Sequence, residues 1–217
     1  MGGKVFLLDV GPDYREQALE YNIDCLDGCI LTHSHYDHIG GFDDLRVYSH
    51  GGKPLPCFML RQTLQELREN FPYLLKPSKE DPNRSNFFSW QIADTAFGKA
   101  NFEGASLEYV SFLQKGMQVM GVKIGNLAYI SDIKEYDSQL IQSLQGVDIL
   151  IVSALRQTTS LMHFSVEEAI AFASLIKPKQ VYLTHIAHEV EHQALLKELP
   201  LNVSLAYDGL EISFQIL

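Results

Sequence analysis

Cysteine is scarce in this chain of 217 residues, which has only Cys25, Cys29 and Cys57. An odd number of cysteines without paired spacing argues against a disulfide framework. Gly28 lies between the first two, and we expect Cys25 and Cys29 to be buried as small apolar residues.

Basic residues and long apolar runs are also in short supply. The chain carries 17 Lys and Arg against 27 Asp and Glu, a formal net charge of −10. This balance argues against a broad basic face that holds nucleic acid. A small phosphorylated substrate remains compatible with it, because two divalent cations would make a site positive. No run has the length of a membrane span, and the N-terminus lacks a secretory pattern. We therefore expect a cytoplasmic chain without a membrane partner, and a homodimer is left open.

The composition that remains is that of an ordinary globular protein, with 46% apolar and 20% charged residues. A chain of this length can bury one substantial core, so we expect a single domain over residues 1–217. Strand patterns cluster early and later alternate with helix patterns, which predicts an α/β fold with two sheets between helices, an αββα four-layer sandwich.

Three histidines and an aspartate lie within six residues, in the stretch Leu31-Thr32-His33-Ser34-His35-Tyr36-Asp37-His38-Ile39-Gly40-Gly41. The run Gly28 to Thr32 before them is short and apolar, which predicts a buried strand. The polar residues therefore enter a loop at a strand end, where rigid scaffolds place chemistry. Imidazole nitrogen and carboxylate oxygen suit zinc, manganese or iron. A purely structural cluster is the alternative.

Two further residues follow apolar strands. Asp132 comes after the predicted strand Gly121 to Ile130, and His185 comes after Val181 to Thr184. If these strands lie side by side, their ends converge with the histidine loop, and the side chains can surround one or two cations. The alternative interpretation of Asp132 alone is a carboxylate that stabilises a turn. The alternative interpretation of His185 alone is a histidine of the core.

The histidine loop resembles the signature of the metallo-β-lactamase fold. Further segments resemble one branch of it, which holds phosphoribosyl 1,2-cyclic phosphate phosphodiesterase and related metal-dependent hydrolases, with the tRNA 3′-end processing endonuclease as a cousin. These segments are Leu8 to Arg15, Ala128 to Asp132, Ala154-Leu155-Arg156, His163-Phe164-Ser165 and Leu183 to His188. The resemblance covers nearly the whole chain and agrees with the αββα sandwich.

The resemblance implies two divalent metal ions, zinc or manganese, and a role for each polar residue. His33 and His35 would bind the first metal, Asp37, His38 and His185 would bind the second, and Asp132 would bridge both. Asp37 would also orient a nucleophilic hydroxide. His163 would act as a catalytic residue that protonates the leaving alkoxide or binds a phosphoryl oxygen. A partly buried histidine in a helix-entry loop is the alternative.

The sequence departs from the branch at several positions. Gln114 stands where the branch has a third histidine for the first metal, which should weaken zinc binding there. His188 matches a structural zinc ligand of the branch, but the cysteines that would complete the site are missing, so we expect His188 to carry no metal. We also expect the family's N-terminal strand to be missing. Ser153 replaces an aspartate before Ala154-Leu155-Arg156, which would loosen the groups that orient the ligands.

Element patterns place these residues. We expect strands over 4–10, 57–60, 107–113, 121–130, 148–152, 203–207 and 210–215, with Asp208-Gly209 as a hairpin turn, and helices over 14–21, 63–70, 138–144, 165–176 and 190–199. Gly51 to Pro54 predicts a turn. Ser165 and Glu168 form a predicted capping box. Residues 71–105 lose periodicity, which indicates a substrate-facing flap or a packed irregular connection.

The leading hypothesis is a metal-dependent phosphodiesterase that hydrolyses a small cyclic phosphate or nucleotide-like substrate through metal-bound hydroxide. The first alternative is a degenerate relative that binds a ligand or a single metal without turnover. The second is a thioester or lactam hydrolase on the same scaffold. RNA cleavage ranks lower because the sequence shows no basic face.

Overall fold

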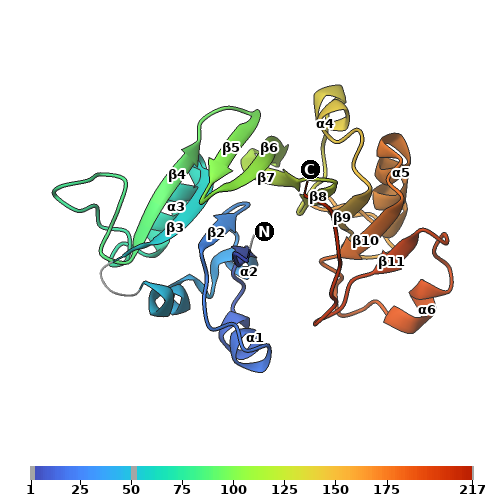
Figure 1. Cartoon of the computed structure of the whole chain (residues 1–217). Helices are drawn as coiled ribbons and strands as arrows, with labels where there is room; N and C mark the ends of the chain where they lie inside the picture. Colours follow the sequence, from blue (N-terminus) through green and yellow to red (C-terminus); the bar gives the residue numbers. More distant parts are fainter. Residues whose placement is uncertain (1–2, 50–52, 217) are drawn as a thin grey trace. The chain divides into compact units, whose positions relative to one another are not determined.

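The computed structural model describes residues 3–49 and 53–216, and the chain divides after Ser106 into two compact units (Figure 1). The predicted turn over Gly51 to Pro54 lies partly outside the described residues. The first unit contains β1 (Phe6–Leu8), α1 (Tyr14–Glu20), β2 (Gly28–Leu31), α2 (Tyr36–Ile39), the 3-10 helix η1 (Phe42–Tyr48), β3 (Leu55–Leu60), α3 (Arg61–Asn70), β4 (Phe88–Ala93) and β5 (Phe97–Phe102). β6 (Ala105–Gln114) spans the boundary. The second unit continues with β7 (Met117–Ile124), β8 (Leu127–Ile130), α4 (Ser138–Ser143), β9 (Ile149–Ser153), α5 (Val166–Ile176), β10 (Gln180–Thr184), α6 (His192–Leu196) and β11 (Val203–Leu205).

The first unit is built on a parallel sheet in the order β1-β2-β3-β4. All four residues of β2 are buried, which explains its unbroken apolar pattern. Parallel strands need crossover connections, and helical segments supply them between β1 and β3. The chain passes very close to itself beside the histidine loop. A Cβ at Gly11 would lie 2.8 Å from the Asp37 carbonyl oxygen, so only glycine fits there.

The second unit carries its own sheet, in which the order of its strands is β11-β10-β9-β8-β7-β6. β8, β9, β10 and β11 are parallel, whereas β6, β7 and β8 are joined as antiparallel neighbours. Helix α5 packs on β9 and β10 and buries Phe172 and Ile176. It begins at the predicted capping box, since Ser165 Oγ accepts from Glu168 N and the Glu168 carboxylate accepts from Ser165 N.

Each unit has a separate hydrophobic core. One core gathers β2, β3, α3 and the ring of Phe42 in the first unit, and the other gathers α5 with the central strands of the second. The two sheets in a mixed α/β chain confirm the predicted fold class. The expectation of one domain over 1–217 stays a prediction.

Several expected elements differ from the structure. The predicted strand 121–130 is two strands, because Gly125 at φ 57° and Asn126 turn the chain between β7 and β8. The segment 210–215 is not a strand. Gln215 instead exchanges two hydrogen bonds with Asn126, so the predicted hairpin across Asp208-Gly209 does not form.

The segment 71–105 is only partly irregular, because it contains β4 and β5. Pairing with β3 decides the conformation of β4, and a single-sequence pattern does not reveal such pairing. The flap role proposed for this segment stays a prediction.

The cysteines also differ from expectation. Cys25 is exposed, whereas Cys29 and Cys57 are buried, and all three are free. Burial raises the pKa of both buried thiols well above the ordinary value. The prediction was therefore right for Cys29 and wrong for Cys25, which lies before β2 rather than on it.

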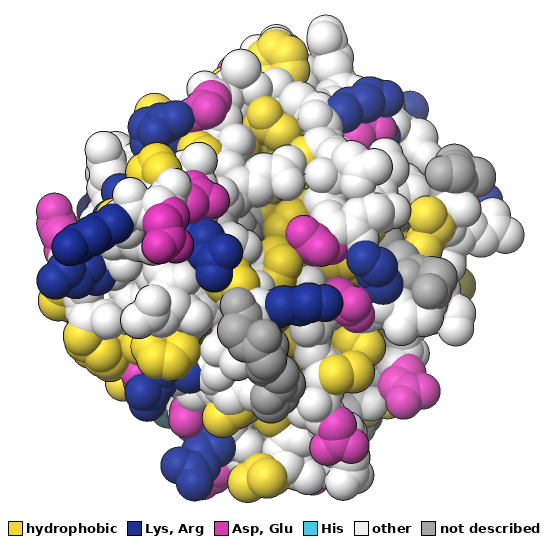
Figure 2. All heavy atoms as spheres, turned by 60° about the vertical axis from the view of Figure 1, so that its left-hand side comes forward, with side chains coloured by type: hydrophobic (Ala, Val, Ile, Leu, Met, Phe, Trp, Pro, Cys, Tyr) yellow, Lys and Arg dark blue, Asp and Glu magenta, His cyan; other side chains and the backbone are white. Residues whose placement is uncertain are grey.

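On the face drawn in Figure 2, Lys and Arg side chains lie scattered among Asp and Glu. Among the described residues, no helix is long and apolar enough to cross a membrane.

Candidate metal centre

In the first unit, the buried carboxylate of Asp9 organises the histidine loop. Asp9 follows β1, and its Oδ1 accepts from Thr32 N at 2.7 Å. Its Oδ2 accepts from Thr32 Oγ1 at 2.8 Å and lies 2.7 Å from His38 Nδ1. Since β1 and β2 are parallel neighbours, their carboxyl ends lie together, and Asp9 can reach across to the loop after β2.

These bonds set the tautomers of two imidazoles. Thr32 Oγ1 gives its only proton to Asp9, so at 2.9 Å it must accept from His33 Nδ1. His38 Nδ1 donates to the Asp9 carboxylate in the same way. Both rings then present Nε2 as the lone-pair nitrogen. A metal-binding histidine typically donates its other ring N–H to a carboxylate or a similar acceptor, so this arrangement fits a cation.

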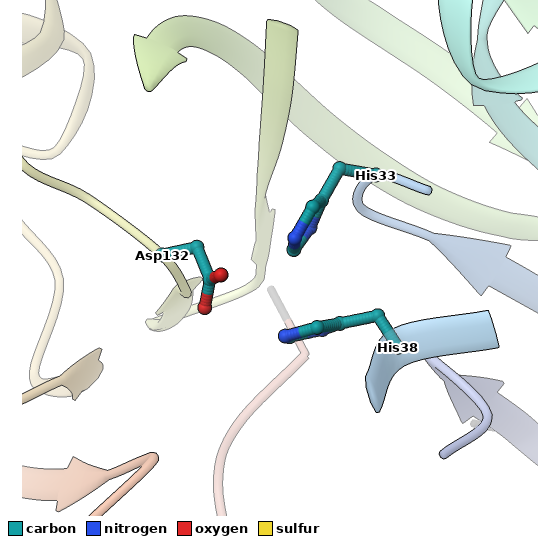
Figure 3. A group of neighbouring side chains, drawn as sticks. All are labelled: His33, His38 and Asp132. Atoms are coloured by element: carbon teal, nitrogen blue, oxygen red, sulfur yellow. The ribbon is translucent and has the colours of Figure 1, made fainter. Parts of the chain in front are cut away.

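The imidazoles of His33 and His38 face one another (Figure 3). The rings of His33 and His38 have centroids 4.2 Å apart, and His33 Nε2 lies 3.0 Å from His35 Nδ1. His33 and His38 are buried, His35 is partly buried, and the Asp37 side chain is exposed. Asp37 Oδ2 lies 3.6 Å from His38 Nε2. The four predicted residues of the loop thus form one cluster of nitrogen and oxygen donors.

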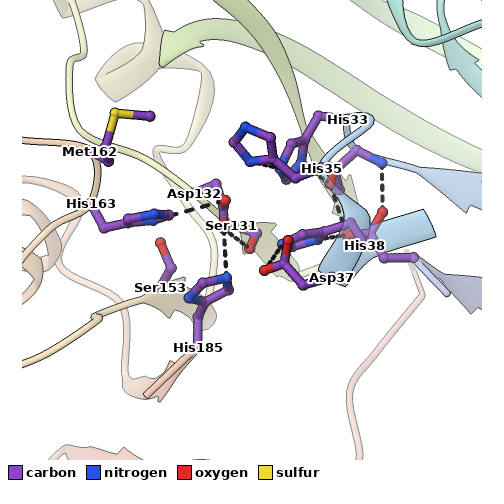
Figure 4. Close-up of polar contacts among 12 residues, drawn as sticks. His33, His35, Asp37, His38, Ser131, Asp132, Ser153, Met162, His163 and His185 are labelled. Carbon is purple, nitrogen blue, oxygen red and sulfur yellow. Dashed lines mark hydrogen bonds and ion pairs between the residues drawn. The ribbon is translucent and has the colours of Figure 1, made fainter. Parts of the chain in front are cut away.

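The second unit holds a second cluster, at the carboxyl ends of its parallel strands (Figure 4). Asp132 follows β8 and is fully buried, and its Oδ1 lies 3.2 Å from His185 Nε2, after β10. Asp132 Oδ2 lies 3.8 Å from His163 Nδ1. The rings of His163 and His185 stack with centroids 5.1 Å apart. One ligand atom from each of the three residues lies within 4.8 Å of the others, a spacing that could hold a metal ion.

The strands between these residues explain the cluster. β8, β9 and β10 are parallel neighbours, with Ile130 opposite Val152 and Thr184 opposite Ser153. Ser153 therefore lies between the two strand ends that carry Asp132 and His185, and its Oγ accepts a long bond of 3.4 Å from Ile133 N. The serine thus contacts the backbone beside Asp132.

The structure places two residues that depart from the family pattern, Gln114 and His188. Gln114 is buried at the end of β6, and its Nε2 donates to the Met162 carbonyl oxygen at 2.9 Å and lies 3.4 Å from His163 Nδ1. The His188 side chain is 97% exposed, and its Nδ1 lies 3.9 Å from Glu189.

The structure therefore brings His33, His35, Asp37 and His38 together in one unit, and Asp132, His163 and His185 together in the other. The common metal site that would join both sets stays a prediction. Sequence reasoning assigned no role to Asp9 and did not connect Gln114 with His163. Asp9 carried a usable signal, because it follows an apolar strand as Asp132 and His185 do.

The fold agrees with comparisons to known proteins. Residues 4–186 match the family described as the beta-lactamase superfamily domain. The chain belongs to this superfamily and has the metallo-β-lactamase fold.

Among solved structures, the chain is similar to a diphosphatase of the PhnP family, at 30% identity and a TM-score of 0.89, covering 100% of this chain and 82% of that one. It is 30% identical over 211 residues to an octanoyltransferase of Porphyromonas gingivalis, covering 96% of this chain and 42% of that protein. The chain spans less than half the length of the curated relatives it matches. Zinc-bound PqqB from Methylobacterium extorquens shares the fold, with 17% identity, a TM-score of 0.74 and coverage of 98% and 84%.

Proposed function

We propose that the chain is a phosphodiesterase that hydrolyses a small cyclic phosphate or nucleotide-like substrate with two divalent cations, zinc or manganese. The observation that carries the proposal is the cluster of Asp132, His163 and His185, in which a fully buried carboxylate lies between two imidazoles. A buried carboxylate is costly unless cationic or hydrogen-bonding partners surround it. The similarity to a PhnP-family diphosphatase supports cleavage at phosphorus.

Each residue would have a defined role in metal binding or catalysis. His33 and His35 would hold one cation, Asp37, His38 and His185 the other, and Asp132 would bridge both. Asp9 would keep His33 and His38 in the tautomers that leave Nε2 for the metal. When bound, the cations would neutralise the phosphoryl oxygens and lower the pKa of water. His163 would either protonate the leaving oxygen as the P–O bond breaks or bind a phosphoryl oxygen, and Asp37 would orient the attacking oxygen.

Hydrolysis of bis(p-nitrophenyl) phosphate tests the proposal. The enzyme purified without chelators should release nitrophenolate with manganese or zinc, and EDTA should stop the reaction. Asp132→Asn and His185→Ala should each lower kcat/KM by at least 100-fold. His188→Ala is the matched control, because His188 is exposed and outside both clusters. No turnover with any divalent cation would overturn the proposal.

Elemental analysis separates the proposal from a degenerate relative without turnover. Two equivalents of metal per chain support the dinuclear enzyme. One equivalent or none, together with no hydrolysis, favours a chain that binds a ligand or a single metal only. Gln114 is the observation behind this alternative, because its amide nitrogen is bound to the Met162 carbonyl.

An acyl substrate is a second candidate, favoured by the similarity to an octanoyltransferase. The same metal ligands would then serve attack on a carbonyl carbon, as in the thioester hydrolase weighed from the sequence. Octanoyl-CoA and bis(p-nitrophenyl) phosphate should be compared at equal enzyme and manganese concentration. A kcat/KM for the thioester above that for the phosphodiester would reverse the order of the two candidates.

A further inference from the structure

Gln114 is a buried polar side chain in contact with His163 that the proposed reaction leaves without a role. It ends β6 just before the turn at Lys115 and Gly116, and it is 1% exposed. Its Nε2 lies 2.9 Å from the Met162 carbonyl oxygen and 3.4 Å from His163 Nδ1. Its Oε1 is buried and has no hydrogen-bond partner among the described residues.

The Met162 carbonyl decides which way the amide faces. A carbonyl oxygen can only accept, so the group of Gln114 that meets it must be the NH₂ end. Turning the amide over would place Oε1 against the Met162 oxygen and against a ring nitrogen. An acceptor left unsatisfied in the interior carries an uncompensated desolvation cost. Oε1 nevertheless has no hydrogen-bond partner among the described residues, so the two hydrogen bonds of Nε2 determine the orientation of the Gln114 amide.

The same NH₂ group then decides the proton on His163. The NH₂ group carries two protons and cannot accept, so one proton serves the Met162 oxygen and the other is directed at His163 Nδ1. Nδ1 must therefore be the accepting nitrogen, and a neutral His163 carries its proton on Nε2. The Asp132 carboxylate does not compete for Nδ1, because 3.8 Å is beyond hydrogen-bond range.

We propose that Gln114 is a positioning residue that holds neutral His163 with Nε2–H as a hydrogen-bond donor to the leaving oxygen, which takes its proton from water. One amide anchors both the backbone of Met162 and the ring of the next residue, so it controls the place of the imidazole and its tautomer together. The ring also stacks on His185, which limits its rotation. The inference rests on the proposed function only for the identity of the leaving group. The histidine expected at position 114 from the resemblance would not supply this NH₂ group.

Nuclear magnetic resonance of the zinc-loaded protein labelled with ¹⁵N-histidine tests the tautomer without any turnover. We expect the Nε2–H form of His163 in the wild type. In Gln114→Glu the carboxylate can only accept, so His163 should change to the Nδ1–H form. In Gln114→Met, a mixture of both forms is expected. Gln118→Met, an exposed position on β7, serves as the control and should leave the spectrum unchanged. A wild-type Nδ1–H form would overturn the inference.

Leaving-group dependence tests the consequence for catalysis. Nitrophenolate stabilises its own negative charge, whereas the alkoxide that leaves from 2′,3′-cyclic AMP depends on a hydrogen-bond donor. Loss of one preorganised donor to a developing oxyanion costs roughly 10²–10³-fold. We therefore expect Gln114→Met to lower kcat for 2′,3′-cyclic AMP at least 30-fold, with KM unchanged, and kcat for bis(p-nitrophenyl) phosphate less than threefold. His163→Ala should show the same pattern, and the double variant should lose no more than His163→Ala alone.

Two results would contradict the positioning role. Equal losses on both substrates, or loss of bound metal in Gln114→Met, would make Gln114 a part of the metal site instead. If the wild type hydrolyses neither substrate, the proposed function fails, and the tautomer measurement alone decides the role of Gln114.

Discussion

Three polar residues that lie within two positions of a strand end share one uncommon backbone conformation. Asp9 has φ 57°, Asp132 has φ 53° and His185 has φ 60°. A left-handed conformation costs a residue other than glycine roughly 1–2 kcal/mol, although Asp and His tolerate it better than most. The sharp turn redirects each side chain away from the strand direction, so we attribute the strain to the placement of two proposed ligands and of the carboxylate that orients the histidine loop.

Asp9→Asn provides a test at this scale. The amide can no longer accept from both Thr32 and His38 as a carboxylate does, so the tautomer of His38 is lost. We expect divalent-cation affinity to fall by about 10- to 100-fold, measured by isothermal titration calorimetry with manganese. Asp208→Asn, at an exposed turn, should leave the affinity unchanged. Equal affinity in wild type and Asp9→Asn would contradict the role of Asp9.

Thiol reactivity is a second property of single residues. The exposed Cys25 should react with Ellman's reagent in the native protein, whereas Cys29 and Cys57 should react only after unfolding. Burial excludes the reagent and raises the pKa of both thiols, and the thiolate is the reactive form. One thiol titrated before guanidinium and three after it is the expected result. Cys25→Ser should abolish the native reaction.

Among the elements, α5 shows how a local sequence signal and tertiary packing agree. Its N-terminus is closed by the capping box of Ser165 and Glu168, and its buried face lies on β9 and β10. The segment before it carries His163. The Leu155 and Phe164 backbones are hydrogen-bonded to each other, which ties this segment to the end of β9.

Removal of the cap should destabilise this element. Ser165→Ala deletes the acceptor for Glu168 N and should lower the free energy of unfolding by about 1 kcal/mol. Urea unfolding followed by circular dichroism measures the change. Ser174→Ala is the control, because Ser174 lies exposed in the last turn of the same helix, away from the cap, and alanine is favoured in helices. A control variant as unstable as Ser165→Ala would contradict the capping explanation.

The same cap predicts a dependence on pH. Burial alone would raise the pKa of Glu168, but the Lys134 ammonium at 2.6 Å and the bonds from Ser165 lower it below the ordinary 4.5. A carboxyl whose pKa is lower in the folded state contributes stability above its unfolded pKa and loses it as the pH falls. Glu168→Gln should therefore be less stable than wild type at pH 7, and the difference should shrink as the pH falls below 4.5. A difference that is constant from pH 7 to pH 3 would contradict this.

At the scale of the whole molecule, the two units have separate cores, and each contributes one set of candidate ligands. If both sets bind the same cations, as we propose, metal binding stabilises the folded state of both units. Binding at 100 times the dissociation constant is worth about 2.7 kcal/mol.

Thermal unfolding with and without cation tests this coupling. Manganese should raise the melting temperature of both units, and EDTA should lower it. Asp132→Asn lies in the second unit, yet it should also abolish the rise for the first unit. The tryptophan fluorescence of Trp90 reports on the first unit alone, since it is the only tryptophan. A rise that persists at Trp90 in Asp132→Asn would show that the first unit binds its cation independently.

The sequence by itself determined the superfamily, the donor types at the strand ends and the cap of α5, because these are local patterns of a few adjacent residues. Only the tertiary structure decided that Asp9 orients His38, 29 positions later, and that Gln114 reaches Met162, 48 positions later. Strand pairing likewise turned 88–93 into β4 and kept 210–215 out of a hairpin. Such contacts depend on which segments become neighbours in space, and no local pattern of side chains encodes that.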